Sequence, residues 1–218
     1  LTLDGVLNVT ESVGGAFGPG VYRLIDYAGV LTDNTLNIGS LPSNYGTVQT
    51  SIARQVNLVV SATPPGGGPG PGPGPGTGEP GGPGGPTTPA SPYNFWDGDK
   101  GAAGDGVVSG GDGIWRASPK NWTTSTGQAN GAFTSASFAV FAAEAGTVTV
   151  DATEGAIRVG GMQFASDGYH LTGDAIALEA GEAVVRVGDG TSLGGAFSAT
   201  VDAKLTGAGR LHKTDAGT

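Results

Sequence analysis

The chain has 218 residues, including 43 Gly and 14 Pro, and a net charge of −9 with only ten Lys and Arg. These few, scattered basic residues exclude nucleic acid and anionic membrane surfaces as expected partners. The sequence has no Cys, which excludes disulfide and thiol chemistry. No apolar run approaches the ~18 residues of a membrane-spanning helix, so we expect no part of this chain to span a membrane.

Composition divides the chain into three parts. Residues 1–63 form a first block, residues 64–92 are almost entirely Gly and Pro, and residues 93–218 form a second block. The Gly/Pro segment begins with a repeat of period two, whereas collagen needs Gly at every third position. We therefore expect an extended spacer, with packing along a neighbouring block or chain as the alternative.

Short β-strands dominate both blocks. Alternating apolar and polar residues predict strands over 21–26, 55–60, 147–151, 156–159, 175–179, 183–187 and 197–201. The nearest approach to a helix is Ala139–Ala145, which Gly146 ends. Three strands at this spacing make a turn of about 20–30 residues, typical of a β-solenoid. An antiparallel sandwich with longer loops would have similar spacing, so both architectures remain open.

The last residues of the chain, followed by the first, form a continuous turn-and-strand pattern. A polar turn, Lys213 to Thr218, would precede the alternating Leu1-Thr2-Leu3. We expect a strand to continue there from one copy to the next, by a peptide bond or by hydrogen bonds between separate chains. The alternative is a segment cut in mid-strand from a larger protein. The predicted unit-to-unit junction comprises Leu1, Thr2, Leu3, Lys213, Thr214, Asp215, Ala216, Gly217 and Thr218.

Catalytic motifs are weak. His170 and His212 are isolated in the sequence, and no Gly-x-Ser-x-Gly elbow accompanies them. We expect no catalytic residues and no enzymatic activity, although carboxylates could still meet across the turns of a solenoid.

The densest acidic stretch runs from Asp97 to Asp112, and oxygen-rich, Gly-flexible loops of this kind suit calcium. However, Gly101 stands where an EF-hand requires Asp or Asn, and no Glu closes the loop. We therefore predict surface Asp-Gly turns, and no metal or cofactor.

Three tryptophans, Trp96, Trp115 and Trp122, could form a platform on which sugars stack. Large aromatic side chains in small β-repeats more often fill the core, and we favour that role. Asn8 and Asn121 begin glycosylation sequons, which we interpret as chance matches.

The second block resembles the passenger-associated repeat of bacterial autotransporters. The matching motifs are Gly113–Arg116, Asn121–Thr123, Phe138–Phe141, Ala145–Val150, Gly161–Phe164, Gly168–Gly173 and Leu211–Thr218. The first block is similar to the segment that follows this repeat in such passengers, through Leu7–Val9, Phe17–Tyr27, Leu36–Pro42 and Gln55–Val60. The order in the family would thus be second block, first block, Gly/Pro segment.

This resemblance implies a right-handed parallel β-helix in two segments, exposed on the extracellular surface of a bacterium. It also implies a structural or adhesive role. We therefore expect a repeat unit of a surface fibre or giant autotransporter-like protein, with other copies of the unit as partners. The alternative is an adhesin module that recognises glycans or host proteins.

Overall fold

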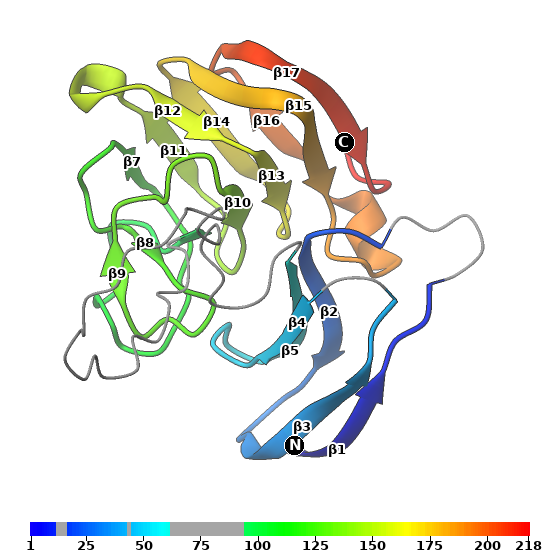
Figure 1. Ribbon diagram of the computed structural model, residues 1–218. Helices are drawn as coiled ribbons and strands as arrows, with labels where there is room; N and C mark the ends of the chain where they lie inside the picture. Colours follow the sequence, from blue (N-terminus) through cyan, green and yellow to red (C-terminus); the bar gives the residue numbers. More distant parts are fainter. Residues whose placement is uncertain (12–16, 43–44, 62–93) are drawn as a thin grey trace, which may run out of the picture.

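The computed structural model describes residues 1–11, 17–42, 45–61 and 94–218, and within them the chain is all-β with several sheets (Figure 1). The Gly/Pro segment 64–92 lies outside the described residues, so its role as a spacer stays a prediction. Two 3-10 turns, Ala152–Glu154 and Leu193–Ala196, are the helices of the described parts. In those parts, no helix has the length and apolar character needed to cross a membrane.

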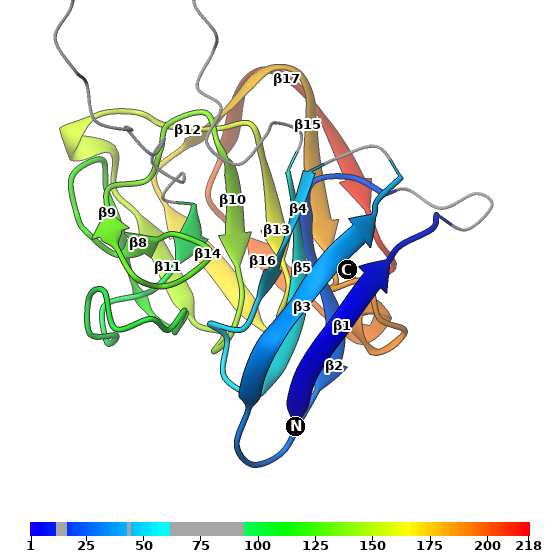
Figure 2. The same cartoon turned by 60° about the horizontal axis from the view of Figure 1, so that its bottom comes forward.

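Two sheets build the second block (Figures 1 and 2). The larger contains β6 (Phe95–Trp96), β8 (Trp122–Thr123), β9 (Asn130–Gly131), β10 (Phe138–Phe141), β12 (Ile157–Val159), β13 (Gly161–Phe164), β15 (Ile176–Val187) and β17 (Leu205–Thr214). The smaller contains β7 (Gly113–Trp115), β11 (Thr147–Val150), β14 (Tyr169–Gly173) and β16 (Ala199–Val201). Pairing is parallel throughout, except between β6, β8 and β9.

Residues far apart in sequence lie side by side in two columns. In the larger sheet, one column runs through Phe138, Gly161, Val184 and His212 on β10, β13, β15 and β17. In the smaller sheet, the other runs through Gly113, Val148, Leu171 and Val201. The chain passes repeatedly from the larger sheet to the smaller, from β10 to β11, β13 to β14 and β15 to β16. Each passage adds one strand to each sheet.

The alternation predicted from sequence explains the core of this block. In β11, Val148 and Val150 are buried while Thr147 and Thr149 are exposed, so the apolar face turns inward. The inward faces enclose a cluster that includes three Trp residues, Phe141 and Phe164.

Two predicted elements differ from the structure. The separate strands expected over 175–179 and 183–187 are one strand, β15, which passes through Gly181 at a φ of +101°. The near-helical stretch Ala139–Ala145 instead begins within β10. Parallel neighbours on both sides, β6 and β13, satisfy its backbone groups and override its helical composition.

The first block has a different architecture. β1 (Thr2–Asn8) and β3 (Thr32–Ser40) form a two-stranded parallel sheet. β2 (Gly20–Asp26), β5 (Gln55–Ser61) and β4 (Tyr45–Gln49) form a three-stranded antiparallel sheet with β5 in the middle. The stacked parallel strands expected for this block are therefore not confirmed. The short connection 50–54 between β4 and β5 suits their antiparallel pairing, whereas β2 reaches β5 across the long segment 27–54.

Candidate unit-to-unit interface

The outermost strand of the smaller sheet, β16, is paired with one named strand, β14. On its other edge the N–H of Ala199 donates to the carbonyl oxygen of Thr218, at 2.8 Å. The N–H of Thr218 donates to the carbonyl oxygen of Phe197, also at 2.8 Å. In a parallel ladder these two bonds place Thr218 opposite Ser198. Thr218 thus pairs in parallel register with the outer edge of β16.

The turn before Thr218 is tightly held. β17 ends at Thr214, and Asp215 follows with a φ of +62°. The Asp215 carboxylate pairs with the guanidinium of Arg186 at 3.0 Å, and the N–H of Gly217 donates to the carbonyl oxygen of Val187. A Cβ at Gly217 would lie 2.6 Å from that oxygen, so only Gly fits there. The turn repeats the passage between sheets that connects β15 to β16.

The apolar core is incompletely covered at this end. Phe197, Ala199, Val201 and Leu205 pack against the core but remain only partly buried. By contrast, Leu171, which lies beside Val201 on the next strand inward, is 0% exposed. The alternation in Phe197-Ser-Ala-Thr-Val201 predicted a strand, but its position at an edge depends on tertiary pairing.

The N-terminal half of the predicted junction lies in β1. The amino group of Leu1 donates to the carbonyl oxygen of Val30 at 2.9 Å, and the N–H of Thr32 donates to the carbonyl oxygen of Leu1 at 2.8 Å. In Figures 1 and 2 the N-terminus is far from the C-terminus, so the structure does not bring the two halves together within one chain. A junction between copies stays a prediction.

The two blocks meet at a buried glutamine. Gln163 on β13 is 0% exposed. Its Oε1 accepts the N–H of Val21 at 2.7 Å, and its Nε2 donates to the carbonyl oxygens of Val21 at 2.8 Å and Gly188 at 2.9 Å. This side chain therefore acts as a substitute strand partner for β2 of the first block.

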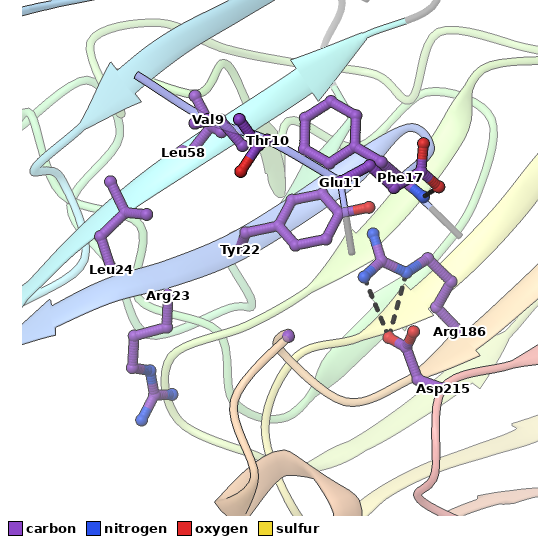
Figure 3. A pocket seen from close by; sticks show the side chains of 11 residues that line it. Val9, Thr10, Glu11, Phe17, Tyr22, Arg23, Leu24, Leu58, Arg186 and Asp215 are labelled. Atoms are coloured by element: carbon purple, nitrogen blue, oxygen red, sulfur yellow. Dashed lines mark hydrogen bonds and ion pairs between the residues drawn. The ribbon is translucent and has the colours of Figure 1, made fainter. Parts of the chain in front are cut away.

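A cavity of about 410 Å³ lies beside this contact, between the two blocks (Figure 3). The Arg186 guanidinium lies 4.3 Å from the centre of the Tyr22 ring, and Phe17 stacks on that ring at 5.2 Å. Arg186 also donates to the carbonyl oxygen of Pro19 and pairs with Asp215. The contacts of Arg186 with Tyr22 and Pro19 cross from one block to the other, so they hold the blocks together.

The predicted core role of the tryptophans is confirmed. Trp96, Trp115 and Trp122 are all 0% exposed, and Trp122 lies between the other two with ring centroids 5.2 and 4.7 Å away. The indole N–H of Trp96 donates to the carbonyl oxygen of Gly111 at 2.7 Å. Since no ring face reaches the surface, these residues form no platform for sugars.

The carboxylates of the acidic stretch each bind groups of the protein. Asp97 is buried, and it accepts the N–H of Ser109 at 2.8 Å and the amide of Asn130 at 2.7 Å. Burial raises the pKa of Asp97, while these hydrogen bonds oppose that rise. Asp112 accepts the N–H of Thr147. Within the described residues, no group of three or more His, Asp or Glu side chains converges to hold a metal ion.

The two histidines lie apart on outward faces. His170 on β14 contacts Asp202, which directly follows β16, at 2.8 Å, and His212 on β17 contacts Glu182 on β15 at 2.9 Å. Asn121, which begins one sequon, is buried, and its amide donates to the carbonyl oxygen of Ile114 at 2.6 Å. These side chains thus have structural partners.

Comparison with known proteins gives one clear similarity. The chain is 44% identical over 220 residues to the adhesin BmaC autotransporter of Brucella suis biovar 1 (strain 1330). The similarity covers 100% of this chain but only 6% of that relative. No family profile and no solved structure matches. The comparison confirms the expected resemblance: the chain is similar to part of a bacterial autotransporter adhesin, which indicates a segment exposed on the outer surface of the bacterium.

Proposed function

We propose that this chain is a structural unit of an extended surface passenger, in which the stacked strands form a parallel β-helix. The observation that supports this proposal is the pair of parallel columns, through Phe138 to His212 and through Gly113 to Val201. Each turn of such a stack buries its apolar face on the turn before it, which makes the structure quasi-one-dimensional. We propose a right-handed helix, because parallel crossover connections are nearly always right-handed.

The unit would act mechanically rather than catalytically. Successive copies would stack end to end, so that each covers the exposed strand edge of the one before, which would otherwise invite uncontrolled pairing. Backbone hydrogen bonds would then run along the axis and resist extension, bending and proteolysis. The net charge of −9 favours repulsion between neighbouring fibres.

Small-angle X-ray scattering on chains of one, two and three copies would test this proposal. A stiff stack predicts that the maximum dimension grows by the same increment with each added copy. A parallel stack rises by about 4.8 Å per turn, which sets the scale of the contribution from the second block. Growth with the square root of copy number would instead indicate independent units on flexible linkers and would contradict the proposal.

An adhesive role is the second candidate, because the similar protein is by name an adhesin. The cavity between the blocks, whose lining includes Thr10 and Glu11, is a candidate site for a small ligand (Figure 3). Glycan and host-protein arrays would test this role. Binding that is lost in Glu11→Ala but kept in Glu182→Ala, an acidic control on β15, would favour it. Absence of reproducible binding would argue against it.

A further inference from the structure

We propose that the Asp4-Gly5 pair of β1 is a site of spontaneous backbone modification, at which the chain closes a succinimide ring and reopens it as isoaspartate. This inference is independent of the stacking role proposed above. Glycine favours the reaction, because it places no side chain beside the attacking backbone nitrogen. Six Asp-Gly pairs lie within the described residues: Asp4-Gly5, Asp97-Gly98, Asp105-Gly106, Asp112-Gly113, Asp167-Gly168 and Asp189-Gly190.

The reaction needs no component other than water. The backbone nitrogen of Gly5 attacks Cγ of the protonated Asp4 carboxyl group. The N–Cγ bond forms, the Cγ–OH bond breaks, and the hydroxyl leaves as water with the proton of the Gly5 N–H. Water then adds to one of the two imide carbonyl carbons. Cleavage of the original peptide C–N bond leaves Gly5 linked through Cγ, as isoaspartate, whereas cleavage of the N–Cγ bond restores aspartate.

The structure brings the two reacting groups of this pair together. The N–H of Gly5 donates to Oδ1 of Asp4 at 2.7 Å. Because Cγ is bonded directly to that oxygen, the nitrogen already lies beside the carbon that it attacks. Such proximity lowers the barrier of an intramolecular reaction, since the chain has already paid the entropy of bringing the groups together.

The surroundings of the pair leave room for the ring. The register of β1 and β3 shifts between Leu3 and Gly5, so Asp4 lies at an irregularity of the parallel ladder. Both Asp4 and Gly5 are exposed, which admits water for the second step. Gly5 has a φ of +96°, and a Cβ built there would meet no atom of the described chain within 4 Å. Neighbouring described atoms therefore do not obstruct ring closure.

Asp105-Gly106 is a matched comparison within the same chain. Asp105 is also exposed, Gly106 has a φ of +83°, and a Cβ there would likewise meet no described atom within 4 Å. However, Oδ1 of Asp105 accepts the N–H of Val107 at 2.9 Å, and the N–H of Gly106 donates to the carbonyl oxygen of Gly127 at 3.1 Å. The reacting groups of this pair are therefore bonded elsewhere rather than to each other. The other four carboxylates also accept backbone N–H groups beyond the next residue, from Ser109, Thr147, Ser198 and Thr191.

Peptide mapping of the aged chain tests this inference. The folded 218-residue protein is kept for weeks in mildly acidic buffer and digested, and electron-transfer mass spectrometry then distinguishes isoaspartate from aspartate at each Asp-Gly pair. We expect Asp4 to rearrange at least about tenfold faster than Asp105. In urea the two rates should converge, because Leu-Asp-Gly-Val and Gly-Asp-Gly-Val are nearly the same local sequence. Equal rates in the folded protein, or the same preference in urea, would overturn the inference.

Two substitutions at Asp4 sharpen the test. Asp4→Asn makes ammonia the leaving group and adds a second Asn-Gly pair to Asn130-Gly131, whose Asn130 side chain is bound by Gly104 at 2.9 Å and by Asp97 at 2.7 Å. We expect position 4 of this variant to deamidate at least about tenfold faster than Asn130. Asp4→Glu is the matched control, because it keeps the charge but could close only a larger ring. Rearrangement at position 4 should then stop, while that at Asp105 is unchanged. Deamidation no faster than at Asn130, or undiminished rearrangement in Asp4→Glu, would contradict the proposed site.

Discussion

Replacing Gln163 by Leu should uncouple the first block from the second. The side chain is fully buried and bonds three backbone groups: the N–H and C=O of Val21 and the C=O of Gly188. Leucine has a similar volume but cannot bond any of them. A buried polar group left without a partner costs about 1–3 kcal/mol. Burying the additional apolar surface of Leu returns about 1–2 kcal/mol. Three such groups together cost about 3–9 kcal/mol, so after the gain from Leu we expect a net loss of at least about 1 kcal/mol in the free energy of unfolding.

Two probes would localise this loss during urea unfolding. The three tryptophans all lie in the core of the second block, so their fluorescence reports that block. Proteolysis within 17–61 reports the first block. In the unsubstituted protein we expect the two transitions to coincide, and in Gln163→Leu we expect the first block to become cleavable at lower urea.

Gln128→Leu is the matched control, because Gln128 is exposed and its substitution should change the free energy of unfolding by less than about 0.5 kcal/mol. A Gln163→Leu protein as stable as this control, with coincident transitions, would refute the reasoning. It would show that the glutamine does not hold the blocks together.

Three further predictions concern the second block. Phe141→Ala removes a ring that stacks on Phe164 with ring centroids 5.1 Å apart. We expect it to lower the free energy of unfolding by about 3–5 kcal/mol, measured by calorimetry. A loss below about 1 kcal/mol would contradict the central position of Phe141 in the core. Gly110→Ala should destabilise the protein far more than Gly111→Ala. Both glycines have a positive φ, but a Cβ at Gly110 would lie 2.3 Å from a carbonyl oxygen, whereas a Cβ at Gly111 would meet no atom within 4 Å. Equal melting temperatures for the two variants would argue against this close packing. Hydrogen bonds from Thr153, followed by the Arg116 contact, lower the pKa of Asp151 from 3.8 to about 2. The stabilisation from ionised Asp151 is therefore fully present above its unfolded pKa of 3.8 and is lost as pH falls through about 2. Asp151→Asn should flatten the dependence of unfolding free energy on pH in that range, and an unchanged slope would count against it.

Local sequence pattern was sufficient to predict many of the strands of the second block. The alternation in Thr147-Val-Thr-Val150 and in residues 156–159 predicted strands, and β11 and β12 formed there. It also indicated which side chains face inward, because a strand turns successive side chains to opposite faces whatever its neighbours are. The aromatic character of Trp96, Trp115 and Trp122 favoured a core role on the same grounds, and burial confirmed it.

Local sequence pattern did not predict which strands pair with one another. Val21 in the first block bonds Gln163 in the second, 142 positions away in the sequence. No local sequence pattern near either residue predicts this contact. The antiparallel arrangement of β2, β5 and β4 likewise depends on which strands pack together, not on their alternation.

The sequence by itself indicated the all-β character, the alternation that sets the inward face of strands such as β11, and the resemblance to autotransporter passengers. Tertiary structure alone decided that β16 lies at an edge, that Thr218 stands opposite Ser198, and that a glutamine and an arginine connect the blocks. The physical reason is range: side-chain alternation is a property of consecutive residues, whereas hydrogen-bond register between strands is fixed only when distant segments are packed against one another.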